Sequence, residues 1–111
     1  MRGRRSHYLR HREVARSLVR ARVEYYARLY GVAPKKIFIK NLKSRWGSCS
    51  SRGNLNFHYK LALLPEPLRD YVVVHEVCHL REFNHGPKFW TLVAREIPLW
   101  KQLRKELHSI H

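Results

Sequence analysis

The sequence is poor in acidic residues and in cysteine, and both shortages are informative. Asp and Glu number 8 among 111 residues, against 23 Lys and Arg, so the formal net charge is +15. That excess favours attraction to polyanions such as nucleic acid. The two cysteines, Cys49 and Cys78, lack the paired spacing of a zinc knuckle or a secreted disulfide framework. We therefore expect a reducing, cytoplasmic location.

Long hydrophobic runs are also missing. No stretch approaches the ~20 apolar residues that a membrane-spanning helix needs. The residues after the basic start include Arg16, Arg20 and Arg22, where a secretory signal needs an apolar segment. These features predict a soluble protein that does not enter membranes, and a length of 111 residues predicts one domain with a modest core.

The N-terminal third divides into two predicted segments. Residues 1–11 are rich in Arg, His and Ser and lack apolar periodicity, which predicts a basic flexible arm before a single domain over residues 12–111. A helix is predicted over residues 13–31, with Gly31 as its C-terminal cap. The apolar residues that recur at helical spacing on it are Val14, Leu18, Ala21, Tyr25 and Leu29.

The middle of the chain alternates between apolar and polar residues. A short strand is predicted around Ile37 and Ile39, after a turn at Pro34. Residues 44–59 resemble a hairpin, because residues 50–54 are typical of a turn and the flanking residues alternate. We expect three short antiparallel strands.

The second half is predicted to be helical. Residues 68–83 are apolar nearly all round, so this helix should be buried, and it should end near Asn84 and Gly86. Pro87 and Pro98 each suit the first turn of a further helix, through about residues 94 and 107. The resulting fold class is α+β: an N-terminal covering helix, a small antiparallel sheet, a buried helix and C-terminal helices.

Residues 75–79 have the pattern H-E-x-x-H inside the buried helix. Residues four apart lie on one helix face, so His75 and His79 can bind one metal ion while Glu76 lies beside its bound water. Neutral imidazoles suit Zn²⁺, which lowers the pKa of bound water to about 7. Glu76 can then act as general base and pass the proton to a leaving amine. The pattern predicts a zinc-dependent hydrolase.

A catalytic zinc needs a third protein ligand. His85 follows His79 by six residues, the spacing of the metzincin pattern, although Glu82 replaces its glycine and a later Met-turn is missing because the only methionine is Met1. Glu96 is the rival ligand, on a following helix, and Glu82 is a third candidate. We favour His85.

The combined motifs resemble the YgjP-like family of metallopeptidases, which are related to the SprT-like and WLM zincins. The resemblance covers about residues 13–107 and rests on residues 43–50, 55–56, 70–80, 84–85 and 89–90. It implies a zincin-like fold in which His75, His79 and His85 bind Zn²⁺ and Glu76 is the base. The implied function is hydrolysis of peptide bonds in a peptide or protein substrate.

Three further residues are candidates for contacts with the substrate or the oxyanion. Arg45 could hold a carboxylate or a developing oxyanion, and His58 or Tyr59 could donate a hydrogen bond to the transition state. The structural alternatives are that Arg45 pairs with the helix and that His58 and Tyr59 form a surface strand pair. An alternative function is a basic module that associates with nucleic acid and has a structural or vestigial metal site.

Overall fold

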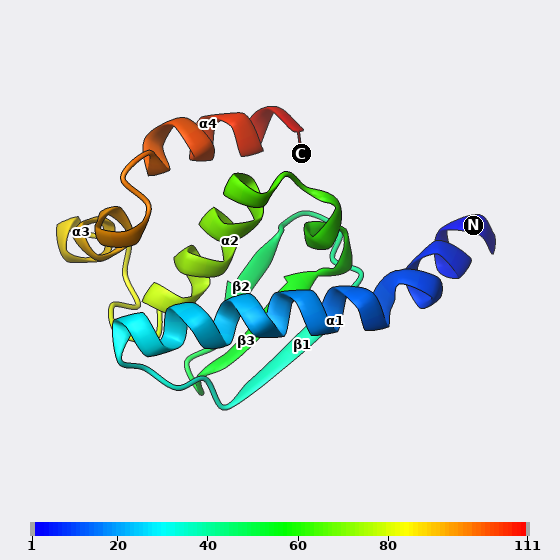
Figure 1. The fold of residues 1–111 in the computed structure, drawn as a ribbon, viewed down its shortest axis with the longest axis horizontal. Coiled ribbons are helices and arrows are strands. Elements are labelled where there is room, and N and C mark those ends of the chain that lie inside the picture. Colours follow the sequence, from blue (N-terminus) through cyan, green and yellow to red (C-terminus); the bar gives the residue numbers. More distant parts are fainter. Residues whose placement is uncertain (1, 111) are drawn as a thin grey trace.

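The chain folds around a small sheet whose one face is covered by helices (Figure 1). The computed structural model describes the backbone of residues 2–110 and the side chains of residues 5–110. Its elements are α1 (Arg2–Tyr30), β1 (Lys36–Lys40), β2 (Gly47–Cys49), β3 (Asn54–His58), the 3-10 helix η1 (Tyr59–Leu63), α2 (Glu66–Cys78), α3 (Pro87–Glu96) and α4 (Trp100–Ile110). The predicted α+β class is confirmed.

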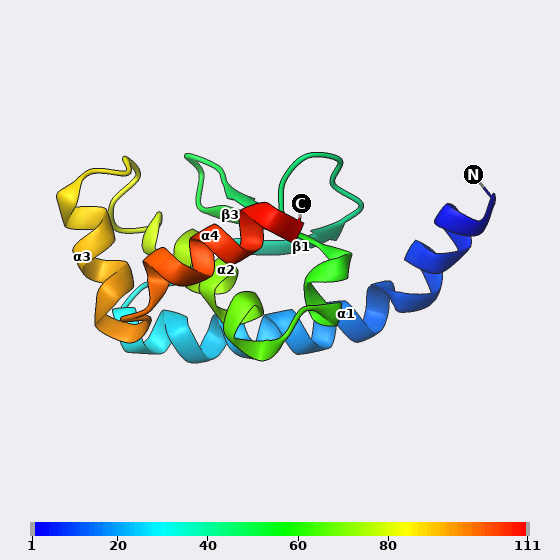
Figure 2. The ribbon, with the colours of Figure 1, turned by 90° about the horizontal axis from the view of Figure 1, so that it is seen from above.

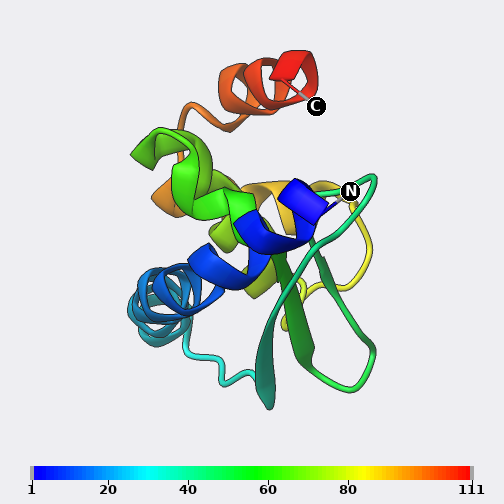
Figure 3. The ribbon, with the colours of Figure 1, turned by 90° about the vertical axis from the view of Figure 1, so that its right-hand side faces the viewer.

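The helices form a layer beside the sheet. Figure 2 shows α1 along one side of the molecule and the strands with their connecting loops along the other. Helix α1 packs on β1 and η1, while α2 packs on β2 and lies between α1 and α4 (Figures 1 and 3). Because α2 contacts β2, α1 and α4, it is the centre of the core. None of the helices within residues 2–110 has the length and apolarity to cross a membrane.

The sheet is mixed, so the prediction of three antiparallel strands was wrong for one of them. The strand order is β1-β3-β2. The hairpin of β2 and β3 is antiparallel as predicted, but β1 runs parallel to β3, with Ile37 opposite Leu55 and Ile39 opposite Phe57. Alternation of apolar and polar residues is the same in parallel and antiparallel strands, so it does not reveal strand direction.

Helix α1 begins near the N-terminus, so the predicted arm over residues 1–11 is helical where the structure describes it. Polar side chains attach this stretch: His7 Nδ1 lies 2.8 Å from the Tyr59 hydroxyl, and the Tyr8 hydroxyl donates to the Ile39 carbonyl at 3.3 Å. Because these contacts are polar, they produce no apolar periodicity from which the helix could be predicted. The predicted boundary between residues 11 and 12 falls inside α1, and residues 1 and 111 lie outside the described residues.

The buried face of α1 also differs from the predicted stripe. Val14 is 65% exposed, and Tyr25 and Leu29 are exposed as well. The residues that face the core are Ala15, Val19, Val23, Tyr26 and Tyr30. Both sets have helical spacing, and the face that contacts α2 and η1 decides between them.

The C-terminal end of α1 is capped as predicted. Gly31 has φ 67°, which glycine adopts without the strain that a Cβ would add. The Gly31 amide donates to the Arg28 carbonyl and the Val32 amide to the Ala27 carbonyl, at 3.2 and 3.0 Å. This is a Schellman motif, and it ends α1 so that the chain turns toward β1.

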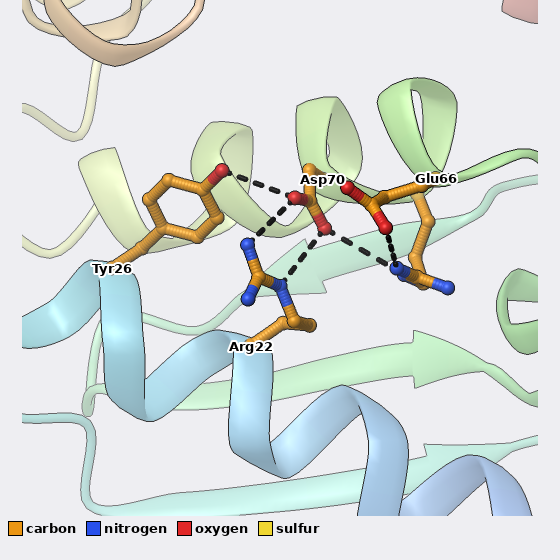
Figure 4. Close-up of polar contacts among 5 residues, drawn as sticks. Arg22, Tyr26, Glu66 and Asp70 are labelled. Carbon is orange, nitrogen blue, oxygen red and sulfur yellow. Dashed lines mark hydrogen bonds and ion pairs between the residues drawn. The ribbon is translucent and has the colours of Figure 1, made fainter.

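A buried carboxylate joins α1 to α2 (Figure 4). Asp70 accepts hydrogen bonds from Arg22 Nε and Nη2 at 3.2 and 2.9 Å, and from the Tyr26 hydroxyl at 3.1 Å. Arg69 forms an ion pair with Asp70 at 3.6 Å and another with Glu66. Because Asp70 is 6% exposed, its charge depends on these partners.

Candidate metal centre

The C-terminal end of α2 supplies two of the predicted ligands. Proline within the first turn lets α2 begin at Glu66, and the helix ends at Cys78, earlier than predicted, with His79 as its C-cap. Residues 79–86 then form a connection to α3, and His85 lies within it. The early helix end turns the chain back toward His75. This turn therefore brings His85, the third ligand that the spacing alone did not decide, close to α2.

The three predicted histidines converge. One ligand nitrogen from each of His75, His79 and His85 lies within 4.8 Å of the others. His79 Nε2 and His85 Nε2 are 2.9 Å apart. Neither Glu96 nor Glu82 belongs to this group of possible ligands. The carboxylate of Glu96 pairs with Arg95, and the backbone carbonyl of Glu82 contacts Nδ1 of the His79 ring. The geometry thus favours His85 over Glu96 and Glu82.

The cluster fits a divalent ion of the zinc type. A carbonyl can only accept a hydrogen bond, so the 3.2 Å contact between His79 Nδ1 and the Glu82 carbonyl places a proton on Nδ1 and leaves the Nε2 lone pair for a metal. Burial lowers the pKa of His79 and of His85, which favours the neutral, ligating form. Nitrogens on a tetrahedral zinc are about 3.3 Å apart, and the 2.9 Å between His79 Nε2 and His85 Nε2 is near that spacing.

Phe89 on α3 holds the three rings in place. Its side chain is fully buried. Its ring is stacked with that of His79 at 4.4 Å between centroids, and it lies edge-on to His75 at 5.1 Å and to His85 at 4.9 Å. In the sequence, Phe89 stands out only as part of the family motif at residues 89–90. Its signal was the helical position after Pro87, which indicates core and not contact with ligands.

Glu76 lies beside His75 and is 5% exposed. Its Oε2 atom is 3.1 Å from His75 Nδ1. Strand β2 approaches it closely at Gly47, where an added Cβ would lie 3.1 Å from Glu76 Cγ and 3.1 Å from the Asn56 carbonyl oxygen. Gly47 therefore permits the contact between β2 and α2 that positions the carboxylate, a role that its place in the motif did not reveal.

Two cavities meet at the cluster. The larger has a volume of about 470 Å³ and extends toward α3 and α4, and the smaller, of about 240 Å³, follows β2. Both are lined by Gly47, His75, Glu76 and His85. The two cavities thus form a groove that crosses the histidines.

The other predicted contact residues separate. Arg45 lines the larger cavity and is exposed. His58 and Tyr59 are buried and are not among the described residues that line either cavity. His58 accepts from the Lys60 amide at the start of η1, and the Tyr59 hydroxyl contacts His7. Neither residue lies at the three histidines. Both are buried, whereas the structural alternative predicted a surface strand pair.

Comparison with known proteins agrees with this fold. A search of curated proteins found no match. Among solved structures, the chain is similar to the crystal structure of the metallopeptidase zymogen of Pyrococcus abyssi abylysin, with a TM-score of 0.74 and 22% identity over 82% of this chain and 92% of that chain. This likeness confirms a zincin-like fold. The model of the YgjP-like metallopeptidase domain matches residues 4–110, so the chain belongs to the YgjP-like metallopeptidase family.

Proposed function

We propose that this protein is a zinc-dependent peptidase in which His75, His79 and His85 hold the metal and Glu76 is the general base. The convergence of three imidazoles beside a buried carboxylate carries the proposal. Zinc supplies a Lewis acid that polarises a carbonyl and makes water a nucleophile near neutral pH.

The proton transfers are assigned to Glu76. In this proposal its carboxylate accepts the proton of the attacking water and then delivers it to the nitrogen of the leaving amine. Its movement is restricted, because its side chain is buried and Gly47 of β2 lies against it. A restricted carboxylate stays within reach of the reacting atoms, which is worth much of the rate enhancement in hydrolases.

Substrate binding is assigned to the edge of the sheet. Strand β2 is at the end of the strand order and pairs only with β3 among the described strands. Its three residues, Gly47–Cys49, line the smaller cavity together with the histidines. An extended peptide that adds to this edge as a further strand passes the histidines with its backbone. Contact with a carboxylate or an oxyanion is assigned to Arg45, because it lines the larger cavity together with the histidines His75 and His85.

The test compares metal content with turnover of a casein or quenched fluorescent peptide substrate. Glu76→Gln is expected to retain zinc and to lose about 10²–10⁴-fold in rate, the contribution of a general base. His85→Ala is expected to lose zinc, whereas Glu96→Gln is the matched control that keeps it. Full activity in Glu76→Gln, or zinc loss in Glu96→Gln with retention in His85→Ala, would contradict the assignment.

The nucleic-acid alternative and the cytoplasmic location stay predictions. The exposed side of α1 includes Arg5, Arg10, Arg20 and Arg28, which is consistent with attraction to a polyanion but equally with a highly charged solvent surface. The three histidines bear on neither the nucleic-acid alternative nor the cytoplasmic location.

A further inference from the structure

The two ends of the groove differ in charge. The larger cavity is lined by Arg45 and Arg104, with His108 beside them, and its carboxylate is the buried Glu76. The smaller cavity has no Lys or Arg among its described lining residues and is bordered by Cys49 and Phe83. We propose that the α4 end of the groove binds a carboxylate of the peptide substrate, held by Arg104 and Arg45. This inference rests on the proposed peptidase function and names its substrate class.

Arg104 is held close to the metal ligands by aromatic rings. Its guanidinium carbon is 5.4 Å from the centroid of the Trp90 ring. The Trp90 ring in turn is stacked on the His85 ring, with 5.8 Å between centroids, and on the ring of Trp100 in α4, with 4.1 Å between centroids. A guanidinium over an aromatic face keeps its edge N–H groups free for an anion. One ring therefore separates Arg104 from a ligand of the proposed metal.

Both arginines are available to a ligand. Within residues 5–110, no carboxylate lies within ion-pair distance of Arg45 or Arg104, although Arg22 and Arg69 share Asp70 and Arg95 pairs with Glu96. Both are exposed, and they belong to separate walls of the cavity, one before β2 and one on α4. Each guanidinium offers a planar fork of donors that matches a carboxylate. Two such forks beside the histidines favour an anion at this end of the groove.

The expected preference is modest because the arginines are exposed. Ion pairs in solvent contribute little, and a bidentate pair on a partly covered surface contributes more. We expect a peptide with a carboxylate at this position to bind about three- to tenfold more tightly than its neutral counterpart. The carboxylate can belong to an acidic side chain or to the C-terminus of the peptide, since both present the same group.

The test measures binding of alanine-based hexapeptides to zinc-loaded Glu76→Gln protein by titration calorimetry, so that hydrolysis does not intervene. One arm compares amidated peptides that carry Glu or Gln at each position in turn, and the other compares free and amidated C-termini. A preference in the first arm identifies an acidic side chain, and in the second a terminal carboxylate. Arg104→Gln, added to this background, should reduce the preference to about one- to twofold.

Lys105→Gln is the matched control, because it removes one charge from the same helix at an exposed residue outside the cavity. It should leave the preference unchanged, and Arg104→Lys should keep part of it. Equal binding of charged and neutral peptides, binding of none of them, or a preference that survives loss of both arginines overturns the inference. Turnover of the unmodified protein is measured separately, so a carboxylate preference without hydrolysis would count against the peptidase proposal alone.

Discussion

Replacing Asp70 by Asn should destabilise the fold strongly, although the two side chains have nearly the same shape. Asn has one acceptor oxygen, whereas Asp70 accepts two hydrogen bonds from Arg22 and one from Tyr26, and pairs with Arg69. The amide NH₂ group would also face these donors. The charge of Arg69, whose side chain is 12% exposed, would lose its buried partner.

The size of the effect follows from the exposure of the partners. Removing one partner of a buried ion pair costs about 3–5 kcal/mol. The side chain of Arg22 is 30% exposed and stays partly hydrated, so we expect about 2–3 kcal/mol at this site. For a domain near this size, that loss lowers the melting temperature by roughly 10 °C or more.

Urea denaturation of metal-free protein, followed by circular dichroism, measures this loss without a contribution from zinc binding. Glu66→Gln is the control, because Glu66 pairs with the same Arg69 but its side chain is 74% exposed. It should change the free energy of unfolding by less than about 0.5 kcal/mol. The reasoning is refuted if Asp70→Asn costs no more than the control does.

Two further predictions concern the groove. Gly47→Ala should lower peptidase activity about tenfold or more while zinc affinity is retained, because the new Cβ displaces the Glu76 side chain and not the histidines; equal loss of zinc would refute this. Burial, followed by the charge of Glu76, raises the pKa of Cys49 to about 11, and burial raises that of Cys78 to about 11. Alkylation of the partly exposed Cys49 by iodoacetamide should therefore be slow at pH 8 and rise about tenfold per pH unit toward pH 11, and a rate like that of free cysteine would contradict it.

Much of the fold could be predicted because its helices have local signals. Pro67 and Pro87 each lie in the first turn of a helix, and Gly31 caps α1 as its place after Tyr30 indicated. These signals act within a few residues and do not depend on tertiary contacts. The hairpin of β2 and β3 was predictable for the same reason, since its turn lies at residues 50–54.

The features that could not be predicted depend on residues distant in sequence. The direction of β1 is set by its pairing with β3, and the buried face of α1 is set by α2 and η1. Arg22 is an example. A charged residue counts as solvent-facing in a periodicity argument, yet this one points toward Asp70, 48 residues later. A buried ion pair reverses the expected polarity of a helix face.

The convergence of the three histidines was easier to predict than the residues that support them. The i, i+4 spacing of His75 and His79 is fixed by the helix itself, so the pattern alone places them together. His85 needs a turn of suitable shape, which spacing suggests without fixing. Phe89 and Gly47 act by contact between elements, and a phenylalanine or a glycine in a motif carries no signal of what it touches.

The burial of each part of the site matches the role proposed for it. His75 and Glu76 lie on α2, the most buried helix, with His79 at its C-cap; Asp70 ties this helix to α1, and Phe89 of α3 packs against His75. A metal centre needs ligands held within a fraction of an ångström, and only a packed element provides this. The two arginines proposed to select the substrate lie instead on a loop and an outer helix, where both are exposed. Substitution there can change specificity without disturbing the metal ligands, because those side chains contribute little to the core.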